Sequence, residues 1–431
     1  MKIFGYLFLA SIIFFTNCNT TEPPPEDTRK LILTLEDASC IEAWININTE
    51  NIQLPATINI LINDSLSHIS ILNTQDSLIY IDSLLPNKTY IFKAELSGIG
   101  NPGSGIQSKE LSVTTMDTTS HNFTFETFIF GGGGEASFIN DVAIIDENNI
   151  WAVGEIYLPD SLGNPDPQAY GIGFWNGQNW QFRKLFNNNI PVSPRGILVL
   201  GHNDIYLSAG SVFHWDGVSL TVQLLYSRLN LPNSNGTIER LWGSSGSSIY
   251  GVGNAGSLIY YNGNQWSIIQ SGTEIHINDA WGIVNDNNET IVYCPVSSFF
   301  TSGDKKILKI KNNLVDSISW NMNRLLYSVW TNSERYLYVS GSGVFENKNG
   351  TWKEIPLPQV STNRIRGNNI NDIFIAGDFG FTAHFNGLSW LLYNELYDID
   401  TQYYSGDIKG NVIVLVGRRF GGGIITIGRR N

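Results

Sequence analysis

Cysteine is scarce in this chain, and so is charge. Three cysteines occur in 431 residues: Cys18, Cys40 and Cys294. They form no CxxC pair, which excludes a zinc site of the usual cysteine spacing and a fold held by a disulfide framework. Because Cys40 and Cys294 fall in different predicted domains, we expect both to be buried free thiols.

Charged residues make up 15% of the chain, below the roughly one quarter of an average protein. The 26 basic and 39 acidic residues leave a net charge of −13. Nucleic-acid binding depends on clustered lysine and arginine, and the sequence has no basic stripe. We therefore expect no nucleic-acid partner.

Motifs for catalysis and for cofactor binding are also missing. The six histidines show neither HxH nor HExxH spacing, which argues against a transition-metal site. No GxSxG nucleophile elbow occurs. Four glycines at 131–134 precede a strand pattern and open no helix, so they do not form a phosphate-binding loop. We expect no metal and no cofactor.

The first 18 residues have the pattern of a secretion signal. Lys2 is followed by an apolar run at 3–15, too short to span a bilayer, and then by Cys18. A cysteine directly after the apolar run resembles bacterial lipoprotein signals, although Phe15 stands where these favour leucine and Asn17 where they favour glycine or alanine. The resemblance implies that Cys18 is lipidated and anchors the protein in the cell envelope, at the outer membrane, facing the periplasm or the surface. The alternative is an ordinary signal peptide followed by an unmodified cysteine.

Two segments precede the repeats described below. Residues 19–29, NTTEPPPEDTR, are polar and proline-rich, which favours an extended tether. Residues 30–117 alternate apolar and polar positions in short runs, which predicts a small all-β domain. The segment from Leu84 through Pro86 to Tyr90 resembles the tyrosine corner of fibronectin type III domains. The resemblance implies an immunoglobulin-like sandwich with Trp44 in its core, serving as a spacer or docking module.

Residues 121–431 repeat one phrase: a strand start, a small residue and glycine, then an aromatic residue, Asn-Gly or Asp-Gly, and tryptophan. IWAVG with FWNGQNW (150–154, 174–180) and IFIAG with HFNGLSW (373–377, 384–390) are clear copies. One position of the central strand recurs every 36–55 residues, at Trp151, Tyr206, Tyr250, Val292, Tyr338, Phe374 and Ile413. This spacing is typical of four-stranded propeller blades, so we predict an all-β, seven-bladed β-propeller. The longest interval contains an insertion at 156–169, predicted to be a surface loop.

The ends of the repeat region predict how the ring closes. The last repeat, 404–428, has only three strand patterns, and the segment 123–130 can supply the fourth. The Asn-Gly and Asp-Gly pairs predict tight type I′ hairpins, in which both central residues have positive φ. The fourth repeat departs from this pattern, with Asn312-Asn313 and no tryptophan.

The Gly-x-x-Trp turn resembles the Asp-box hairpin of sialidases and related propellers, Ser-x-Asp-x-Gly-x-x-Trp. The aspartate of that motif is replaced in every copy, by Trp175, Trp215, Tyr261, Lys348 and Phe385. The resemblance therefore implies the packing of the hairpin and not the activity of a sialidase.

Aligning the predicted inner strands places one polar residue of each repeat in a column: Asp141, Arg195, Arg240, Asp279, Ser328, Arg366 and Ser405. The candidate ligand-binding residues are its charged members, Asp141, Arg195, Arg240, Asp279 and Arg366, which suit an anionic or polyhydroxylated ligand at the channel mouth. The alternative is that they pair across neighbouring blades, for example Arg240 with Asp279.

A row of tryptophans follows two residues after this column, at Trp242, Trp281 and Trp330. Stacking on sugars is one interpretation. Packing between blades is favoured, because residues i and i+2 share a sheet face and blade faces pack on each other.

These patterns favour a lipid-anchored binding or scaffolding protein of the cell envelope, which presents its propeller to a protein or glycan partner. The alternative is a carbohydrate-active hydrolase or lyase at the channel mouth, and a third possibility is an assembly factor for an envelope complex. An enzyme requires paired carboxylates about 5–10 Å apart at an open cleft, whereas a scaffold predicts acids neutralised by arginines. The sequence identifies no catalytic residue.

Overall fold

The computed structural model describes residues 27–97, 105–131, 135–160, 162–164, 166–298, 303, 305–348 and 350–431. The predicted signal peptide with Cys18, and residues 19–26 of the tether, lie outside this part of the chain.

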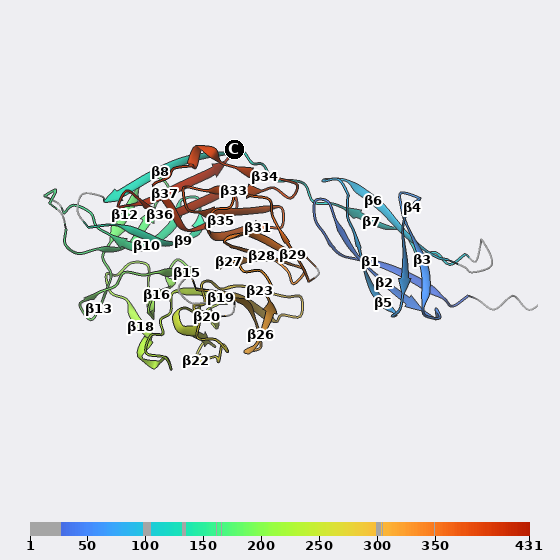
Figure 1. The fold of residues 1–431 in the computed structure, drawn as a ribbon, viewed down its shortest axis with the longest axis horizontal. Helices are drawn as coiled ribbons and strands as arrows, with labels where there is room; N and C mark the ends of the chain where they lie inside the picture. The colour runs from blue at the N-terminus through green and yellow to red at the C-terminus, as the bar shows by residue number, and fades with distance from the viewer. Residues whose placement is uncertain are drawn as a thin grey trace, which may run out of the picture. The chain divides into compact units, whose positions relative to one another are not determined.

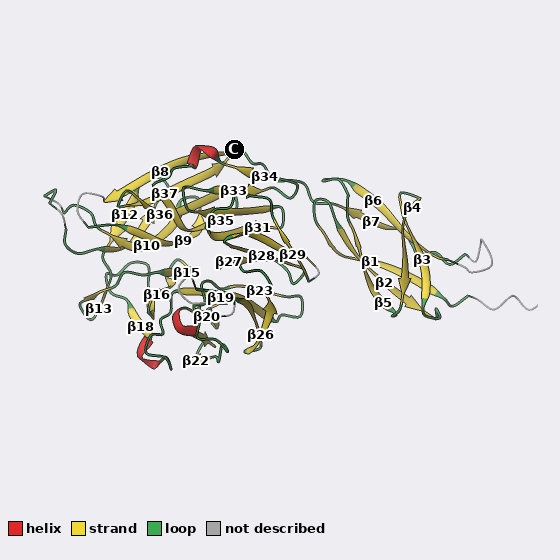
Figure 2. Cartoon of the chain, viewed as in Figure 1, coloured by secondary structure: helices red, strands yellow, loops and turns green. Residues whose placement is uncertain are grey.

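Strands dominate the described residues (Figure 2), and the helices there are three short 3-10 turns, η1 (Arg228–Asn230), η2 (Asn254–Gly256) and η3 (Asn394–Leu396). None of these has the length and apolar character needed to cross a bilayer. Cys40 and Cys294 are buried free thiols, as expected.

The chain divides into two compact units, of which the first contains two antiparallel sheets (Figure 1). One sheet has the order β1-β2-β5 and the other β4-β3-β6-β7. Their strands are β1 (Lys30–Ala38), β2 (Ala43–Glu50), β3 (Ala56–Ile62), β4 (Ser65–Leu72), β5 (Asp76–Ile81), β6 (Thr89–Leu96) and β7 (Leu111–Thr114). Burial alternates along β3, as expected of a strand with one face on a core. Trp44 in β2 is 1% exposed, so its predicted place in the core is confirmed.

The second unit contains seven four-stranded antiparallel sheets among its described residues, which we number as blades 1 to 7. Blades 1 to 4 comprise β9 (Phe138–Asp146), β10 (Asn149–Ile156), β11 (Tyr170–Trp175) and β12 (Trp180–Arg183); β15 (Gly196–Gly201), β16 (Asp204–Ala209), β17 (Ser211–Trp215) and β18 (Gln223–Tyr226); β19 (Arg240–Ser245), β20 (Ser248–Val252), β21 (Leu258–Tyr261) and β22 (Trp266–Ile268); and β23 (Trp281–Val284), β24 (Thr290–Val296), β25 (Lys306–Lys311) and β26 (Leu314–Ser319). Blades 5 to 7 comprise β27 (Leu326–Trp330), β28 (Tyr336–Gly341), β29 (Gly343–Lys348) and β30 (Thr351–Glu354); β31 (Thr362–Asn369), β32 (Asp372–Gly377), β33 (Thr382–Phe385) and β34 (Trp390–Leu392); and β35 (Thr401–Lys409), β36 (Val412–Arg419), β37 (Gly422–Arg430) and β8 (Phe123–Gly131). A short hairpin, β13 (Phe186–Asn187) with β14 (Ile190–Pro191), lies between blades 1 and 2 in the sequence.

The blades form a closed ring. The first strand of each blade contacts that of the next, from β9 through β15, β19, β23, β27, β31 and β35, and β35 contacts β9 again. The last blade takes its fourth strand from the start of the region, because β8 pairs with β37 from Phe123 opposite Arg430 to Gly131 opposite Gly422 (Figure 1). The predicted seven blades and the predicted closing strand are therefore confirmed. The closure pairs the edge of β37 that would otherwise be exposed, so the last blade has four strands like the others.

The hairpin turns differ from the prediction in their backbone. Gly177 has a φ of 90° and Gly263 a φ of 92°, but Asn176 and Asn262 before them have no positive φ. Each asparagine instead accepts two backbone N–H bonds through its side chain, as Asn176 does from Gln178 at 3.0 Å and Asn179 at 2.9 Å. The expected type I′ turn is therefore wrong for these copies, because the side-chain bonds stabilise a longer loop. A type I′ turn does fit blade 4, the repeat without the Asn-Gly pair. There Asn312 and Asn313 have φ values of 53° and 60° and connect the paired residues Lys311 and Leu314.

The tryptophan row packs between blades. Trp330 is buried, and Trp242 and Trp281 pack against the apolar clusters of the neighbouring blades. A Cβ on Gly282 would lie 2.6 Å from the ring of Trp242, and one on Gly367 would lie 2.7 Å from the ring of Trp330. Glycine is needed at both positions because the indole rests on the backbone of the next blade. The preference for inter-blade packing over sugar stacking is confirmed.

Candidate functional site

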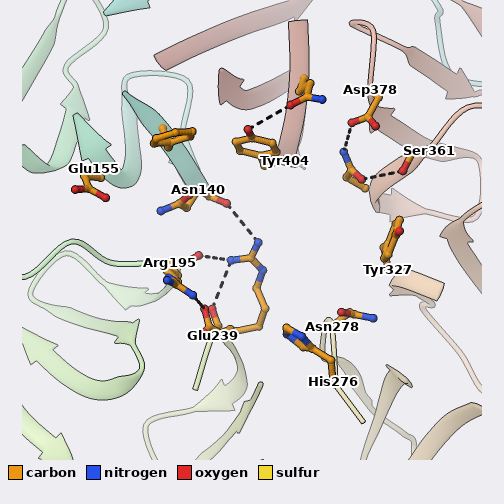
Figure 3. Close-up of a pocket in the computed structure, with 14 residues that line it drawn as sticks. Asn140, Glu155, Arg195, Glu239, His276, Asn278, Tyr327, Ser361, Asp378 and Tyr404 are labelled. Carbon is orange, nitrogen blue, oxygen red and sulfur yellow. Dashed lines mark hydrogen bonds and ion pairs between the residues drawn. The ribbon is translucent and has the colours of Figure 1, made fainter. Parts of the chain in front are cut away.

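The mouth of the central channel holds a cavity of about 650 Å³. All seven blades contribute to its lining, and Figure 3 shows the side chains arranged around the opening. We call one residue from each blade the mouth ring: Asn140, Arg195, Glu239, Asn278, Tyr327, Asn363 and Tyr404.

The residue after each member of the mouth ring forms a second set, which we call the buried ring: Asp141, Gly196, Arg240, Asp279, Ser328, Arg364 and Ser405. Strand register supports this assignment, because Asp141, Arg240, Ser328 and Arg364 pair with the residue directly before a glycine on the second strand: Val153, Val252, Ser340 and Ala376. Adjacent strand residues project in opposite directions. One residue of each pair therefore lines the cavity and the next lies deeper in the channel, except in blade 3, where Glu239 and Arg240 both line the cavity.

The predicted column mixes these two rings. Asp141, Arg240, Asp279, Ser328 and Ser405 belong to the buried ring, but Arg195 belongs to the mouth ring and its side chain is 60% exposed. Gly196 pairs with Ser208 at the equivalent position of blade 2. A Cβ there would lie 2.6 Å from the carbonyl oxygen of Glu239, which explains why this blade has no side chain in the buried ring.

Blade 6 contributes Arg364 to the buried ring, so the prediction of Arg366 at this position is wrong. Arg366 pairs with Phe374, two positions further along the strand. Arg364 lies ten residues before Phe374, as Asp141 lies ten before Trp151, so the same interval from the central strand leads to Arg364 and not to Arg366. The Arg-x-Arg spacing of Arg364 and Arg366 was a further signal in the sequence, because residues two apart in a strand share a face and both arginines therefore project to the same side.

The aspartates of the buried ring are bonded to arginines from blade 6. Arg366 binds Asp279 with two nitrogens, each at 2.9 Å. Arg364 donates to Asp279 at 2.8 Å and to Asp141 at 2.6 Å, so it connects blades 4 and 1. Ser328 and Ser405 donate to Asp279 and Asp141 at 2.5 and 2.6 Å.

The expected pair of Arg240 with Asp279 is not formed. Arg240 instead donates to backbone carbonyl oxygens, those of Arg195 and Asn140. The physical reason is that the two blade 6 arginines already satisfy both oxygens of Asp279. Pairing across blades, the alternative to ligand binding, thus describes Asp141, Asp279 and Arg366.

These contacts set the ionisation of the buried acids. Burial raises the pKa of Asp279, but the charges of Arg366 and Arg364 and their hydrogen bonds lower it by more, so its pKa lies well below the usual range. Burial also raises the pKa of Asp141, but the charges of Arg364 and Arg240 lower it by more, so the pKa of Asp141 is lowered as well. Both carboxylates therefore stay ionised at neutral pH. They are the neutralised acids expected of a scaffold, and neither is placed to exchange protons with a ligand.

No protein-family model and no curated protein sequence matches the chain. Among solved structures it is similar to YCF48 bound to D1 peptide, with a TM-score of 0.53 and 13% identity over 73% of this chain and 99% of that chain. It is also similar to the WD40 β-propeller domain of Doa1, with a TM-score of 0.51 and 11% identity over 70% of this chain and 96% of that chain. The WD40 repeats of RRP9 give a TM-score of 0.50 and 8% identity over 70% and 97%. The second unit therefore shares the β-propeller fold of these proteins.

The mouth of this propeller is lined by groups that donate and accept hydrogen bonds. Arg195 is bonded to Glu239 at 3.0 Å, and Asn363 donates to Asp378 at 3.0 Å (Figure 3). Burial lowers the pKa of His276. The charge of Glu239 raises this pKa, and the charges of Arg240 and Arg195 lower it, so His276 is neutral at pH 7. Amide, tyrosine and charged side chains thus converge on one opening above a closed floor. Of the five predicted ligand-binding residues, Arg195 and Arg240 line this cavity.

Proposed function

We propose that the protein is a lipid-anchored binding protein of the cell envelope, whose β-propeller presents its channel mouth to a protein or glycan partner. The observation that carries this proposal is the mouth ring, in which seven blades each place one residue around a cavity of about 650 Å³. Cavities of this size with a few convergent polar groups are typical of binding sites. A propeller of the same fold, YCF48, has a peptide bound, which favours a protein partner over a glycan.

A rigid floor supports the same proposal. The buried arginines and aspartates fix the inner strands against one another, so the mouth residues are held in place before a ligand arrives. Preorganisation lowers the entropic cost of binding. A ligand is then recognised at the mouth and does not pass through the channel, where the side chain of Arg364 connects Asp141 with Asp279.

The test is a pull-down from envelope extract run beside a glycan array. Arg195→Ala removes an exposed guanidinium at the mouth, and we expect it to reduce partner binding at least tenfold, which corresponds to about 1.4 kcal/mol. Arg324→Ala is the matched control, because Arg324 is also largely exposed, at 43%, and makes only a long ion pair of 3.9 Å. Equal binding by both variants would place the partner elsewhere, for example on the 156–169 loop. Arg366→Ala would leave Asp279 without its bidentate partner, so a loss of binding in that variant would not locate the partner at the mouth.

The anchoring of the chain is a separate part of the proposal. We infer that Cys18 carries lipid and that the first unit is a fibronectin type III-like spacer. The signal pattern at 1–18 supports the first statement, and the sheet orders β1-β2-β5 and β4-β3-β6-β7 support the second. Mass spectrometry of the membrane fraction tests the anchor, and an unmodified Cys18 would contradict it.

A further inference from the structure

A second hollow adjoins the mouth cavity. It has a volume of about 560 Å³ and shares four lining residues with the mouth cavity: Asn140, Glu155, Arg195 and Glu239. The two hollows are therefore continuous. A ligand seated at the mouth can extend into this side hollow, which runs outward along blade 2.

The side hollow differs from the mouth in its chemistry. Its wall contains the aliphatic side chains of Ile190, Val192 and Leu224, together with Pro191. Ile190 is 66% exposed and Leu224 43% exposed, so both present apolar surface to a ligand. Covering this surface favours binding, because it removes apolar area from water.

Charges of opposite sign flank the aliphatic wall. Arg195 and Glu239 neutralise each other at 3.0 Å, and Thr237 also donates to Glu239, at 2.6 Å. Glu155, shared with the mouth, accepts a bond from the hydroxyl of Tyr157 at 2.7 Å. Arg228 lines the side hollow only. Among the residues that the structure describes, no carboxylate forms an ion pair with Arg228, and the nearby Glu239 is paired with Arg195.

We propose that the two hollows form one groove for an extended peptide, whose aliphatic side chain fills the side hollow and whose neighbouring carboxylate pairs with Arg228. This inference rests on the proposed binding function and names the chemical class of the partner. The amide nitrogens of Asn140, Asn278 and Asn363 donate to groups of the protein itself. Their carbonyl oxygens can accept from the N–H groups of a peptide main chain. Acidic sugars also carry a carboxylate, but a glycan has no aliphatic side chain to fill the wall of Ile190, Val192 and Leu224, so the wall favours a peptide.

The test uses the full chain and an array of immobilised octapeptides in which each position is varied in turn. We expect binding to favour peptides with Leu, Ile or Val next to Asp or Glu. Leu224→Asp should weaken binding to these peptides by about tenfold or more, because it replaces apolar surface that the ligand covers with a carboxylate. Leu391→Asp is the matched control, since Leu391 is 42% exposed and lies on the fourth strand of blade 6 as Leu224 lies on that of blade 2.

A charge reversal gives a second, independent readout. Arg228→Glu should shift the preferred neighbour of the aliphatic residue from Asp or Glu to Lys or Arg, without loss of the aliphatic preference. This result is informative even if Leu224→Asp folds poorly. An unchanged preference for acidic residues would overturn the inference, and so would an array without any side-chain preference.

The failures of the two proposals can be told apart. If Arg195→Ala abolishes capture of the partner but the peptide array shows no preference, the mouth binds a partner and the peptide groove is wrong. If a glycan on the array binds and Leu224→Asp weakens it, the peptide groove is wrong in favour of a glycan. If neither Arg195→Ala nor Leu224→Asp changes any binding, both proposals fail.

Discussion

Arg364 shows what one buried side chain contributes to this molecule. It lies in blade 6 and bonds at once to Asp279 of blade 4 and Asp141 of blade 1. A buried ion pair adds little to stability against an apolar replacement, because both charges must leave water. Removing one partner is a different matter, since the remaining charge is then buried without compensation. The buried ring should therefore be sensitive to single substitutions at its acids.

We predict that Asp279→Asn lowers the free energy of unfolding by about 3–5 kcal/mol, because Arg366 then lacks the carboxylate that both its terminal nitrogens contact. Urea unfolding followed by circular dichroism measures the change. The control is Asp286→Asn on an exposed loop, which should stay within about 0.5 kcal/mol of the parent. A loss of less than about 1 kcal/mol for Asp279→Asn would show that the network is not under this electrostatic constraint.

A second prediction concerns the pair of histidines beside the closing strand. The Nδ1 atoms of His121 and His384 lie 2.8 Å apart, and His384 also bonds to Asp372 at 2.7 Å. Burial lowers the pKa of His121 to about 4, with the charges of His384 and Arg430 acting in the same direction and Asp372 against them. Ser389 is the remaining polar neighbour of its ring.

The sign of the effect follows from this lowered pKa. The unfolded chain binds a proton at His121 below a pH of about 6.5, whereas the folded protein does so only near pH 4. Stability contributed by the neutral ring is complete above pH 6.5 and falls as the pH decreases toward 4. We expect a loss of about 1–2 kcal/mol between pH 7 and pH 5. Urea midpoints over this range measure it, and His121→Gln should remove most of the slope; a variant with the parent's slope would assign it to other groups.

At the scale of the element, the sequence was sufficient to predict the blades but not to predict which residues of the inner strands face the cavity. The repeat length and the tryptophan positions predicted seven blades, and the three-strand last repeat predicted β8, because each follows from hydrophobic periodicity and from the need to pair an edge. An interval of ten residues separates Trp151, Tyr206 and Phe374 from Asp141, Gly196 and Arg364, so the sequence contains the signal for Gly196 and Arg364. The mouth ring was missed because the repeat pattern does not show which of two adjacent residues faces the cavity, although every one of its members directly precedes a buried-ring residue.

The closing strand gives the prediction at this scale. Deleting 121–130 should unfold or aggregate the propeller, since β37 would lose its partner along the pairs from Arg430–Phe123 to Gly422–Gly131. The control is a variant that moves 122–131 behind Asn431 through a two-residue Asn-Gly turn. The N–H of Asn431 already donates to the carbonyl of Asn122 at 2.9 Å, so the relocated strand can form a hairpin with β37. Thermal melting and gel filtration measure both variants. Unchanged stability after deletion would contradict the closure, as would failure of the relocated strand to restore it.

At the scale of the whole molecule, every residue of the mouth ring and of the side hollow belongs to the second unit. We therefore predict that a fragment of residues 118–431 binds the partner of the full chain with the same affinity within a factor of about two. The fragment retains β8, and with it the closed ring. Surface plasmon resonance with the captured partner gives the comparison, and a fragment of residues 132–431, which lacks β8, is the negative control. A folded 118–431 fragment that binds at least tenfold more weakly would show that the first unit takes part in recognition, and the groove at the mouth would then be only part of the site.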